Sequence, residues 1–125
     1  MRYIIRVMKI ESEVGKILRK SRMTVAVAES CTGGLISSRI TDISGSSDYF
    51  LMGIVAYSDK IKENILGVSP GLLQKHGAAS KQVALEMAKG ARLIANTNIG
   101  IGVTGIAGPT GGTKKKPVGL VYIAL

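Results

Sequence analysis

The sequence has 125 residues, 46% of them hydrophobic, which fits one globular domain with a core of ordinary size and excludes a disordered chain. Seventeen Lys and Arg residues against eight Asp and Glu give a net charge of +9, which favours anionic partners such as phosphates and nucleotides. The single cysteine excludes an intrachain disulfide and is typical of the reducing cytoplasm, where we expect this protein. No apolar run approaches the roughly 20 residues of a membrane span, and no cluster of His, Cys and carboxylates has the spacing of a metal site.

The first half of the sequence predicts two helices that alternate with two strands. Residues 1–8 are basic and apolar, and we interpret them as an accessory segment before the first helix. Apolar residues recur at helical spacing over 9–21 and predict an amphipathic helix. The short apolar run 24–28 is typical of a buried parallel strand, and a polar turn then leads into a helix over 35–40. Residues 49–57 predict the second strand.

The second half adds three helices, a long glycine-rich loop and two strands. The expected elements are helices over 58–66, 69–77 and 80–96, a strand over 99–104, the loop 105–119 and a final strand over 120–125. This alternation predicts an α/β sandwich around a mostly parallel sheet, organised as one domain over 1–125. A last strand without a following helix is uncovered, so we expect either a homo-oligomer or a chain shorter than its fold.

The turn that follows the first strand is the first candidate site. In Glu29–Gly34 two glycines permit a tight turn and a close approach to a ligand, and the next helix begins with unpaired N–H groups that can hold an anion. Ser30 at its tip is placed like a nucleophile, although the residues alone favour an N-cap serine. Cys31 is intrinsically more nucleophilic, but a lone cysteine beside a strand is more often a small core residue. Glu29 is a further polar group that can orient its neighbours or bind a ribose.

A serine nucleophile needs a base, and the sequence offers two candidates. His76 is the only histidine, but it precedes Gly77 at a helix end and has no acidic partner in its motif. Lys62 is the alternative, because a lysine sheltered from water has a lowered pKa and can accept a proton from serine. The usual place of a lysine is a solvated helix face, and we assign Lys60 to solvent.

The glycine loop is the second candidate site. Its φ-permissive residues can form a concave cluster of N–H groups for a phosphate, and Thr104, Thr110 and Thr113 can add hydroxyls. The loop lacks the P-loop pattern, and a connector without a ligand is an equally good interpretation of it in isolation. Lys116 can add charge near a phosphate, although three adjacent lysines are more often a solvated run. Ser80 is most simply the N-cap of its helix.

Four segments together are far more specific than any one of them. They are Glu29-Ser-Cys-Thr-Gly-Gly34, Tyr57-Ser-Asp-Lys-Ile-Lys62, His76-Gly-Ala-Ala-Ser80, and Thr104-Gly-Ile-Ala-Gly-Pro-Thr-Gly-Gly112 continuing to Lys116-Pro-Val-Gly119. In this order they resemble the C-terminal domain family of the competence-damage protein CinA, whose stand-alone members are nicotinamide-nucleotide amidohydrolases (NMN deamidases). The resemblance runs from about Ile10 to Leu125 and implies a three-layer α/β/α fold. Family members usually continue with another strand and a long helix, so the resemblance also implies a C-terminally shortened chain.

The resemblance implies hydrolysis of the carboxamide of nicotinamide mononucleotide to nicotinate mononucleotide and ammonia, without a cofactor. Ser30 is then the nucleophile, Lys62 the base, and Tyr57 a hydrogen-bonding partner of that pair or of the amide. The implied oxyanion donors are the backbone N–H groups of Cys31, Thr32, Gly33 and Gly34. The implied phosphate-binding residues are Thr104, Gly105, Gly108, Thr110, Gly111 and Gly112.

Two other functions stay open at this point. The first is a nucleotide- or phosphate-binding module without turnover, because the missing C-terminal segment can supply part of the site. The second is a basic nucleic-acid binder, which the net charge favours. It is the weaker of the two, since the sequence has no Trp, one Phe and four Tyr to stack on bases.

Overall fold

The computed structural model describes residues 9–125, and the segment 1–8 that we interpret as accessory lies outside the described residues. A four-stranded sheet forms the centre, with the spatial order β2-β1-β3-β4. Strands β1 (Val25–Glu29), β2 (Phe50–Val55) and β3 (Ile99–Gly105) are parallel, and β4 (Val121–Ala124) lies antiparallel to β3 at one edge. The mostly parallel sheet expected from the sequence is therefore confirmed.

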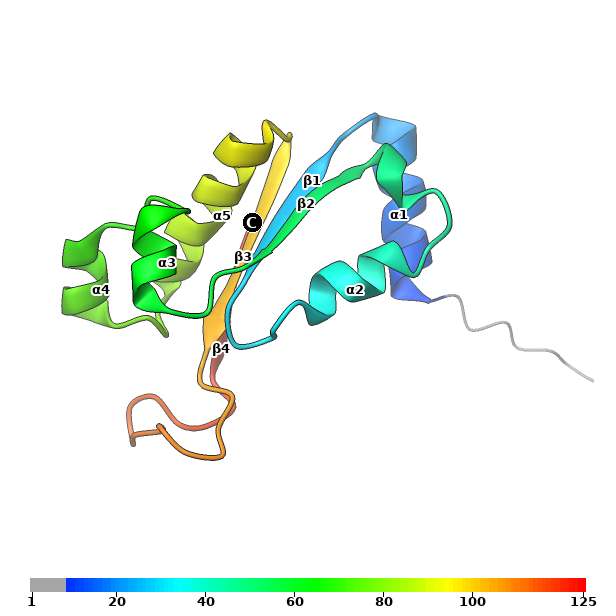
Figure 1. Cartoon of the computed structure of the whole chain (residues 1–125). Helices are drawn as coiled ribbons and strands as arrows, with labels where there is room; N and C mark the ends of the chain where they lie inside the picture. The colour runs from blue at the N-terminus through cyan, green and yellow to red at the C-terminus, as the bar shows by residue number, and fades with distance from the viewer. Residues whose placement is uncertain (1–8) are drawn as a thin grey trace, which may run out of the picture.

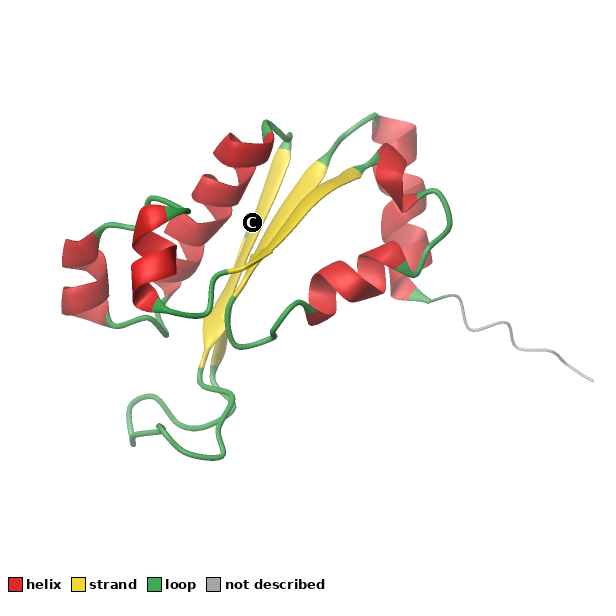
Figure 2. Cartoon of the chain, viewed as in Figure 1, coloured by secondary structure: helices red, strands yellow, loops and turns green. Residues whose placement is uncertain are grey.

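Helices cover both faces of this sheet, as Figures 1 and 2 show. On one side lie α1 (Ile10–Ser21) and α2 (Leu35–Thr41), with the short 3-10 turn η1 (Ser46–Asp48) before β2. On the other side lie α3 (Asp59–Asn64), α4 (Pro70–His76) and α5 (Lys81–Ala95). This is the three-layer α/β/α sandwich that the resemblance implies.

Alternate residues of β1 separate the two halves of the core. Ala26 and Ala28 face α3–α5 and pack with Val83 and Met87 of α5. Val25 and Val27 face the opposite side, and their cluster of buried side chains includes Leu18 of α1 and Tyr49. Every residue of β1 is buried, and its first four residues form a continuous apolar run that ends at Glu29, as is typical of buried parallel strands.

Two glycines of β3 let α5 lie directly on the sheet. A Cβ atom at Gly100 would be 2.1 Å from the Ala88 carbonyl oxygen, and one at Gly102 would be 2.1 Å from that of Ala84. Gly53 of β2 is a similar close-approach point, where a Cβ atom would lie 2.3 Å from the Ser37 hydroxyl of α2. The strand irregularity itself lies at the start of the β1–β2 pairing, where Val25 pairs with Phe50 and Ala26 with Met52.

Helices α5 and α3 begin with the serine caps that the sequence predicts. The Ser80 hydroxyl accepts a hydrogen bond from the Val83 N–H at the start of α5, and Asn96 ends that helix in the left-handed conformation. Ser58 caps α3 by accepting from the Ile61 N–H.

Over residues 9–125 there is no helix with the length and apolar character needed to cross a membrane.

Candidate functional site

Three loops meet at one edge of the sheet, where the parallel strands β1, β2 and β3 end (Figure 1). They are the turn after β1, the segment that leads from β2 into α3, and the glycine loop after β3. Together they form a cleft of about 400 Å³, which we call the site cleft. It is lined by Ser30, Cys31, Tyr57, Asp59, Lys62, Ala78, Thr104, Gly105, Ile106, Ala107, Gly108, Thr110 and Gly111. Ligands bind at this edge in open α/β sheets.

Backbone hydrogen bonds hold Ser30 in place. Its N–H donates to the Val103 carbonyl at 2.9 Å, and its carbonyl accepts from the Gly33 N–H at 3.1 Å. Helix α2 begins only at Leu35, after Gly34 with a φ of 101°, and no side chain caps its N-terminus from the N-cap position. The N-cap interpretation of Ser30 is therefore wrong, and its hydroxyl is not committed to that helix.

Glu29 caps α2 in its place. One carboxylate oxygen accepts from the Ile36 N–H at 2.8 Å and the Thr32 hydroxyl at 2.7 Å, and the other accepts from the Ser37 N–H at 3.0 Å and the Ser37 hydroxyl at 2.7 Å. Burial alone would raise the pKa of this carboxyl, but these hydrogen bonds outweigh it and the pKa is lowered. Glu29 thus orients the turn and has no oxygen left for a ribose.

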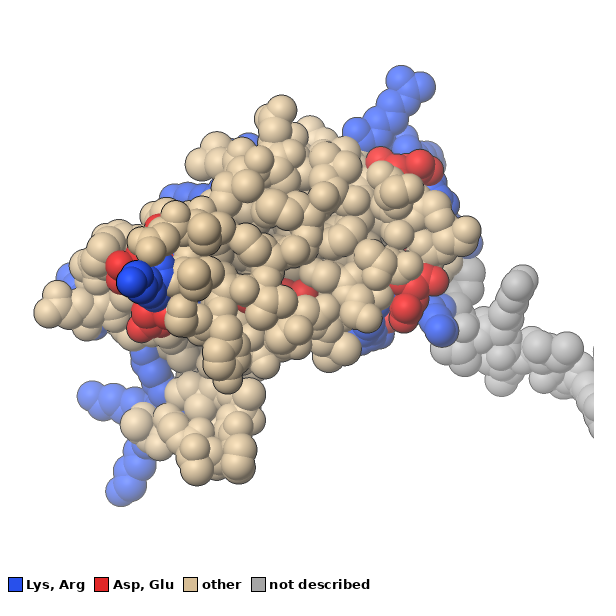
Figure 3. All heavy atoms as spheres, viewed as in Figure 1, with Lys and Arg blue, Asp and Glu red and all other residues tan. Residues whose placement is uncertain are grey.

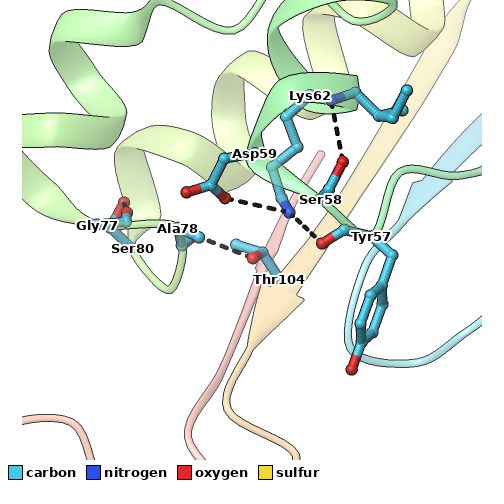
Figure 4. Close-up of polar contacts among 9 residues, drawn as sticks. Tyr57, Ser58, Asp59, Lys62, Gly77, Ala78, Ser80 and Thr104 are labelled. Carbon is cyan, nitrogen blue, oxygen red and sulfur yellow. Dashed lines mark hydrogen bonds and ion pairs between the residues drawn. The ribbon is translucent and has the colours of Figure 1, made fainter. Parts of the chain in front are cut away.

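Lys62 is the buried cation of the site cleft. It lies on α3 with only 1% of its side chain exposed, and its Nζ donates to the Tyr57 carbonyl at 3.0 Å and lies 3.7 Å from an Asp59 carboxylate oxygen (Figure 4). Burial lowers the pKa of Lys62, and the Asp59 carboxylate and the Cys31 thiol offset part of this effect. A neutral amine is therefore easier to form here than on a solvated lysine such as Lys60, which is exposed as expected.

Ser30 and Lys62 line the same cleft, but the lysine makes its hydrogen bond to the Tyr57 backbone rather than to the serine. The Tyr57 side chain is 74% exposed, and its ring extends away from the Lys62 Nζ (Figure 4). Its contact with Lys62 is thus made by the main chain, and a role for its hydroxyl stays a prediction.

The four expected oxyanion donors are not equivalent. The Gly33 N–H is taken up by the Ser30 carbonyl, whereas the N–H groups of Cys31, Thr32 and Gly34 donate to no backbone carbonyl within residues 9–125. The pKa of the Cys31 thiol is raised by burial, although the N–H groups of Cys31 and Thr32 act against this shift. Of these residues Cys31 lines the site cleft, and the holding of an oxyanion by the turn stays a prediction.

The glycine loop contributes most but not all of the residues expected to bind phosphate. Thr104, Gly105, Gly108, Thr110 and Gly111 line the site cleft. Gly112 does not line it; it packs against Val118, where a Cβ atom would lie 2.7 Å from the Val118 nitrogen. Thr113 is occupied in a local turn, since its hydroxyl accepts from the Lys116 N–H at 3.0 Å.

The base of the loop is closed and joined to the α4–α5 turn. The Ile106 N–H donates to the Leu120 carbonyl at 2.9 Å, and the Gly119 N–H donates to the Ile106 carbonyl at 2.7 Å. The Thr104 hydroxyl donates to the Ala78 carbonyl at 2.9 Å (Figure 4). These hydrogen bonds hold together the residues at the bottom of the site cleft, which we call its floor.

His76, the other candidate base, is not in the site cleft; its carbonyl accepts a hydrogen bond from the Lys116 ammonium.

Sequence reasoning missed two residues that line the site cleft, Asp59 and Ala78. The signal for Asp59 was its position three residues before Lys62 on the same helix, which allows an ion pair. Over residues 9–125 no group of three or more His, Cys, Asp or Glu side chains is placed to hold a metal ion.

A profile of the CinA C-terminal domain family matches residues 7–125. The chain belongs to the CinA C-terminal domain family. Among solved structures, the competence/damage inducible protein CihA from Agrobacterium tumefaciens is similar at 43% identity with a TM-score of 0.88, over 91% of this chain and 69% of that one. The competence damage-inducible protein A from Klebsiella pneumoniae has 33% identity and the same TM-score of 0.88, over 91% of this chain and 71% of that one.

Curated CinA relatives are much longer than this chain. A protein named as competence-damage inducible in Halothermothrix orenii is 56% identical over 116 residues, and a CinA-like protein from Geobacter sulfurreducens is 53% identical over 116 residues. Each match covers 93% of this chain and 28% of the relative. The first name states a link to competence and damage, the second a likeness to CinA, and neither states a substrate or a reaction.

Proposed function

We propose that this CinA-family domain hydrolyses the carboxamide of nicotinamide mononucleotide to nicotinate mononucleotide and ammonia. The observation that carries the proposal is Lys62, an almost completely buried lysine with a lowered pKa that lines the same cleft as Ser30. A buried lysine without a full ion pair is costly to a fold, so its presence in a cleft favours chemistry over structure.

In the proposed reaction the Ser30 oxygen attacks the carboxamide carbon while the neutral Lys62 amine takes the hydroxyl proton. The negative charge that develops on the carboxamide oxygen is held by the N–H groups of Cys31 and Thr32. When the tetrahedral intermediate collapses, the carbon–nitrogen bond breaks and Lys62 returns its proton to the leaving ammonia. A water molecule then adds to the ester on Ser30, releases the carboxylate and restores the hydroxyl.

The contacts of Lys62 would hold its amine in one position while it acts as the base. Its Nζ keeps one N–H donor on the Tyr57 carbonyl, which leaves its lone pair or its other protons for the serine (Figure 4). For the nucleotide phosphate, the proposal uses the backbone of Gly105, Gly108 and Gly111 and the hydroxyl of Thr110, all of which line the cleft.

The test is ammonia release from nicotinamide mononucleotide by the purified protein. We expect Ser30→Ala and Lys62→Met to abolish release, while Lys60→Gln, an exposed lysine two residues away, leaves it unchanged. Release that continues at the full rate in Ser30→Ala would show that the mechanism is wrong.

A second candidate is a nucleotide-binding module without turnover. The observation that favours it is that the lysine hydrogen-bonds to the Tyr57 carbonyl and not to Ser30, so nucleophile and base are not joined. It predicts saturable binding of nicotinate mononucleotide by calorimetry together with no ammonia from the amide, a result that separates it from the amidase.

A further inference from the structure

A second cleft lies beside the site cleft, on the other side of the turn that joins α4 to α5. Its volume is about 510 Å³, and we call it the basic cleft. Its lining residues are Lys75, His76, Ser80, Lys81, Gln82, Lys116 and Tyr122. The turn separates the two clefts, because Ala78 lines the site cleft while His76 and Ser80 line the basic cleft.

The lining brings cations together from segments that are far apart in the sequence. Lys75 lies on α4, Lys81 begins α5, and Lys116 comes from the end of the glycine loop. No Asp or Glu is among the lining residues, so these positive charges are not neutralised within the cleft. Figure 3 shows Lys and Arg side chains projecting where the glycine loop leaves the body of the molecule, at the lower left.

One of these lysines is held in place. Lys116 is half-buried, and its Nζ donates a hydrogen bond to the His76 carbonyl across the cleft wall. An ammonium has three donors, so two N–H groups of Lys116 are left for a ligand. A fixed ammonium loses less side-chain entropy on binding an anion than a free surface lysine does.

The remaining lining groups are hydrogen-bonding groups that suit a phosphate. The first turn of α5 contributes the Lys81 ammonium and the Gln82 amide, and Tyr122 contributes a phenol from β4. The Ser80 hydroxyl is already used, since it donates to the Gly77 carbonyl and accepts from the Val83 N–H. The positive end of this 15-residue helix adds to the field of the lysines but is not needed to define the cleft.

We propose that the basic cleft is a second anion site, which binds a phosphate group of a small ligand. The inference does not depend on the amidase, because no residue of the basic cleft takes part in that reaction. A small phosphoanion is favoured over a nucleic acid because the cations surround one concavity, and its lining offers only the rings of Tyr122 and His76 for stacking on bases.

The test is calorimetric titration of the whole chain with pyrophosphate as the probe. We expect saturable binding to the unmodified protein and to Ser30→Ala. In the double variant Lys75→Gln, Lys81→Gln, the Kd should rise by roughly tenfold, which is about the effect of two solvent-exposed charge pairs. The matched control is Lys9→Gln, Lys20→Gln, which removes the same charge from residues flanking and within α1 on the opposite face of the sheet and should leave the Kd unchanged.

Lys116→Gln is a separate variant, because this lysine also anchors the glycine loop; it should weaken pyrophosphate binding at least as much as the double variant. Absence of saturable binding, equal losses in the test and control variants, or binding of a DNA duplex but not of pyrophosphate would each overturn the proposal. A competition arm identifies the source of the phosphate. If pyrophosphate displaces nicotinate mononucleotide and the displacement weakens in Lys75→Gln, Lys81→Gln, one nucleotide reaches both clefts. If both bind together, the basic cleft takes a separate anion. Displacement that is unchanged in this variant would place pyrophosphate at the glycine loop and overturn the proposal.

Discussion

Replacing Asp59 by Asn should move the pH dependence of the proposed amidase toward acid. The carboxylate lies 3.7 Å from the Lys62 Nζ and stabilises the ammonium form. Its side chain is 60% exposed, so solvent screens the pair and the interaction is near the aqueous limit of about 1 kcal/mol. Without it, Lys62 loses its proton more readily, because burial then acts with less opposition.

The base in this mechanism is the neutral amine, so kcat/KM rises with pH as Lys62 deprotonates. An interaction of about 1 kcal/mol corresponds to a change of about fivefold in the fraction of neutral amine on the acid side of that rise. The activity of Asp59→Asn at acid pH, expressed relative to its own plateau, should therefore be about fivefold higher than in the unmodified protein. The plateau itself should fall slightly, since a weaker base accepts a proton less readily.

The assay is ammonia release from nicotinamide mononucleotide over a range of pH, and the matched control is Glu63→Gln. Glu63 is also on α3 and carries the same charge, but it does not line the site cleft. The Cys31 thiol also favours charged Lys62 and is present in both variants. An acid limb that stays in place in Asp59→Asn, or shifts equally in Glu63→Gln, would refute the assignment of Lys62 as the base.

Three further predictions concern stability. Glu29→Gln should cost about 2–3 kcal/mol in the free energy of unfolding measured with urea, because the charged acceptor of four hydrogen bonds becomes a neutral amide. The pKa of Glu29 is lowered in the folded state, so its contribution to the free energy of unfolding is full above the ordinary pKa of 4.5 and is lost as the pH falls through the folded pKa. The unmodified protein should therefore lose stability in acid more steeply than the variant. Lys62→Met should keep or raise the free energy of unfolding while it removes activity, since a buried ammonium is replaced by an apolar chain of similar length; a large loss of stability would indicate a structural role instead. Gly102→Ala should destabilise by more than about 2 kcal/mol, because its Cβ atom would meet the α5 backbone, whereas Gly71→Ala near the start of α4 has space and should be neutral or stabilising in thermal unfolding.

The order of elements could be predicted from the sequence because each element carries its own signal. Period-3.6 apolar spacing marks α1 and α5, the continuous apolar run marks β1, and Ser58 and Ser80 are caps that act within three residues. These are local effects, so sequence spacing is enough to find them. The meeting of three loops at one sheet edge also followed once the strands were taken as parallel.

What the sequence could not predict depends on side chains that choose between competing partners. Ser30 looked like a cap because it precedes a helix, but buried Glu29 reaches forward and takes the amides of Ile36 and Ser37. Lys62 was expected beside Ser30, yet its hydrogen bond goes to the carbonyl of Tyr57. Gly112 belongs to the expected phosphate loop by pattern, but it turns toward Val118. In each case the outcome depends on tertiary distances of a few ångström.

The absence of a side chain at Gly100 and at Gly102 affects the structure beyond β3. They set how close α5 lies to the sheet, and the start of α5 carries the turn whose Ala78 carbonyl meets the Thr104 hydroxyl at the floor of the site cleft. The distance between α5 and the middle of the sheet therefore also affects the width of the site cleft at the end of the sheet. A mutation in the core that pushes the helix outward would then be felt as a change in the size of ligand accepted, with every residue of the cleft itself unaltered.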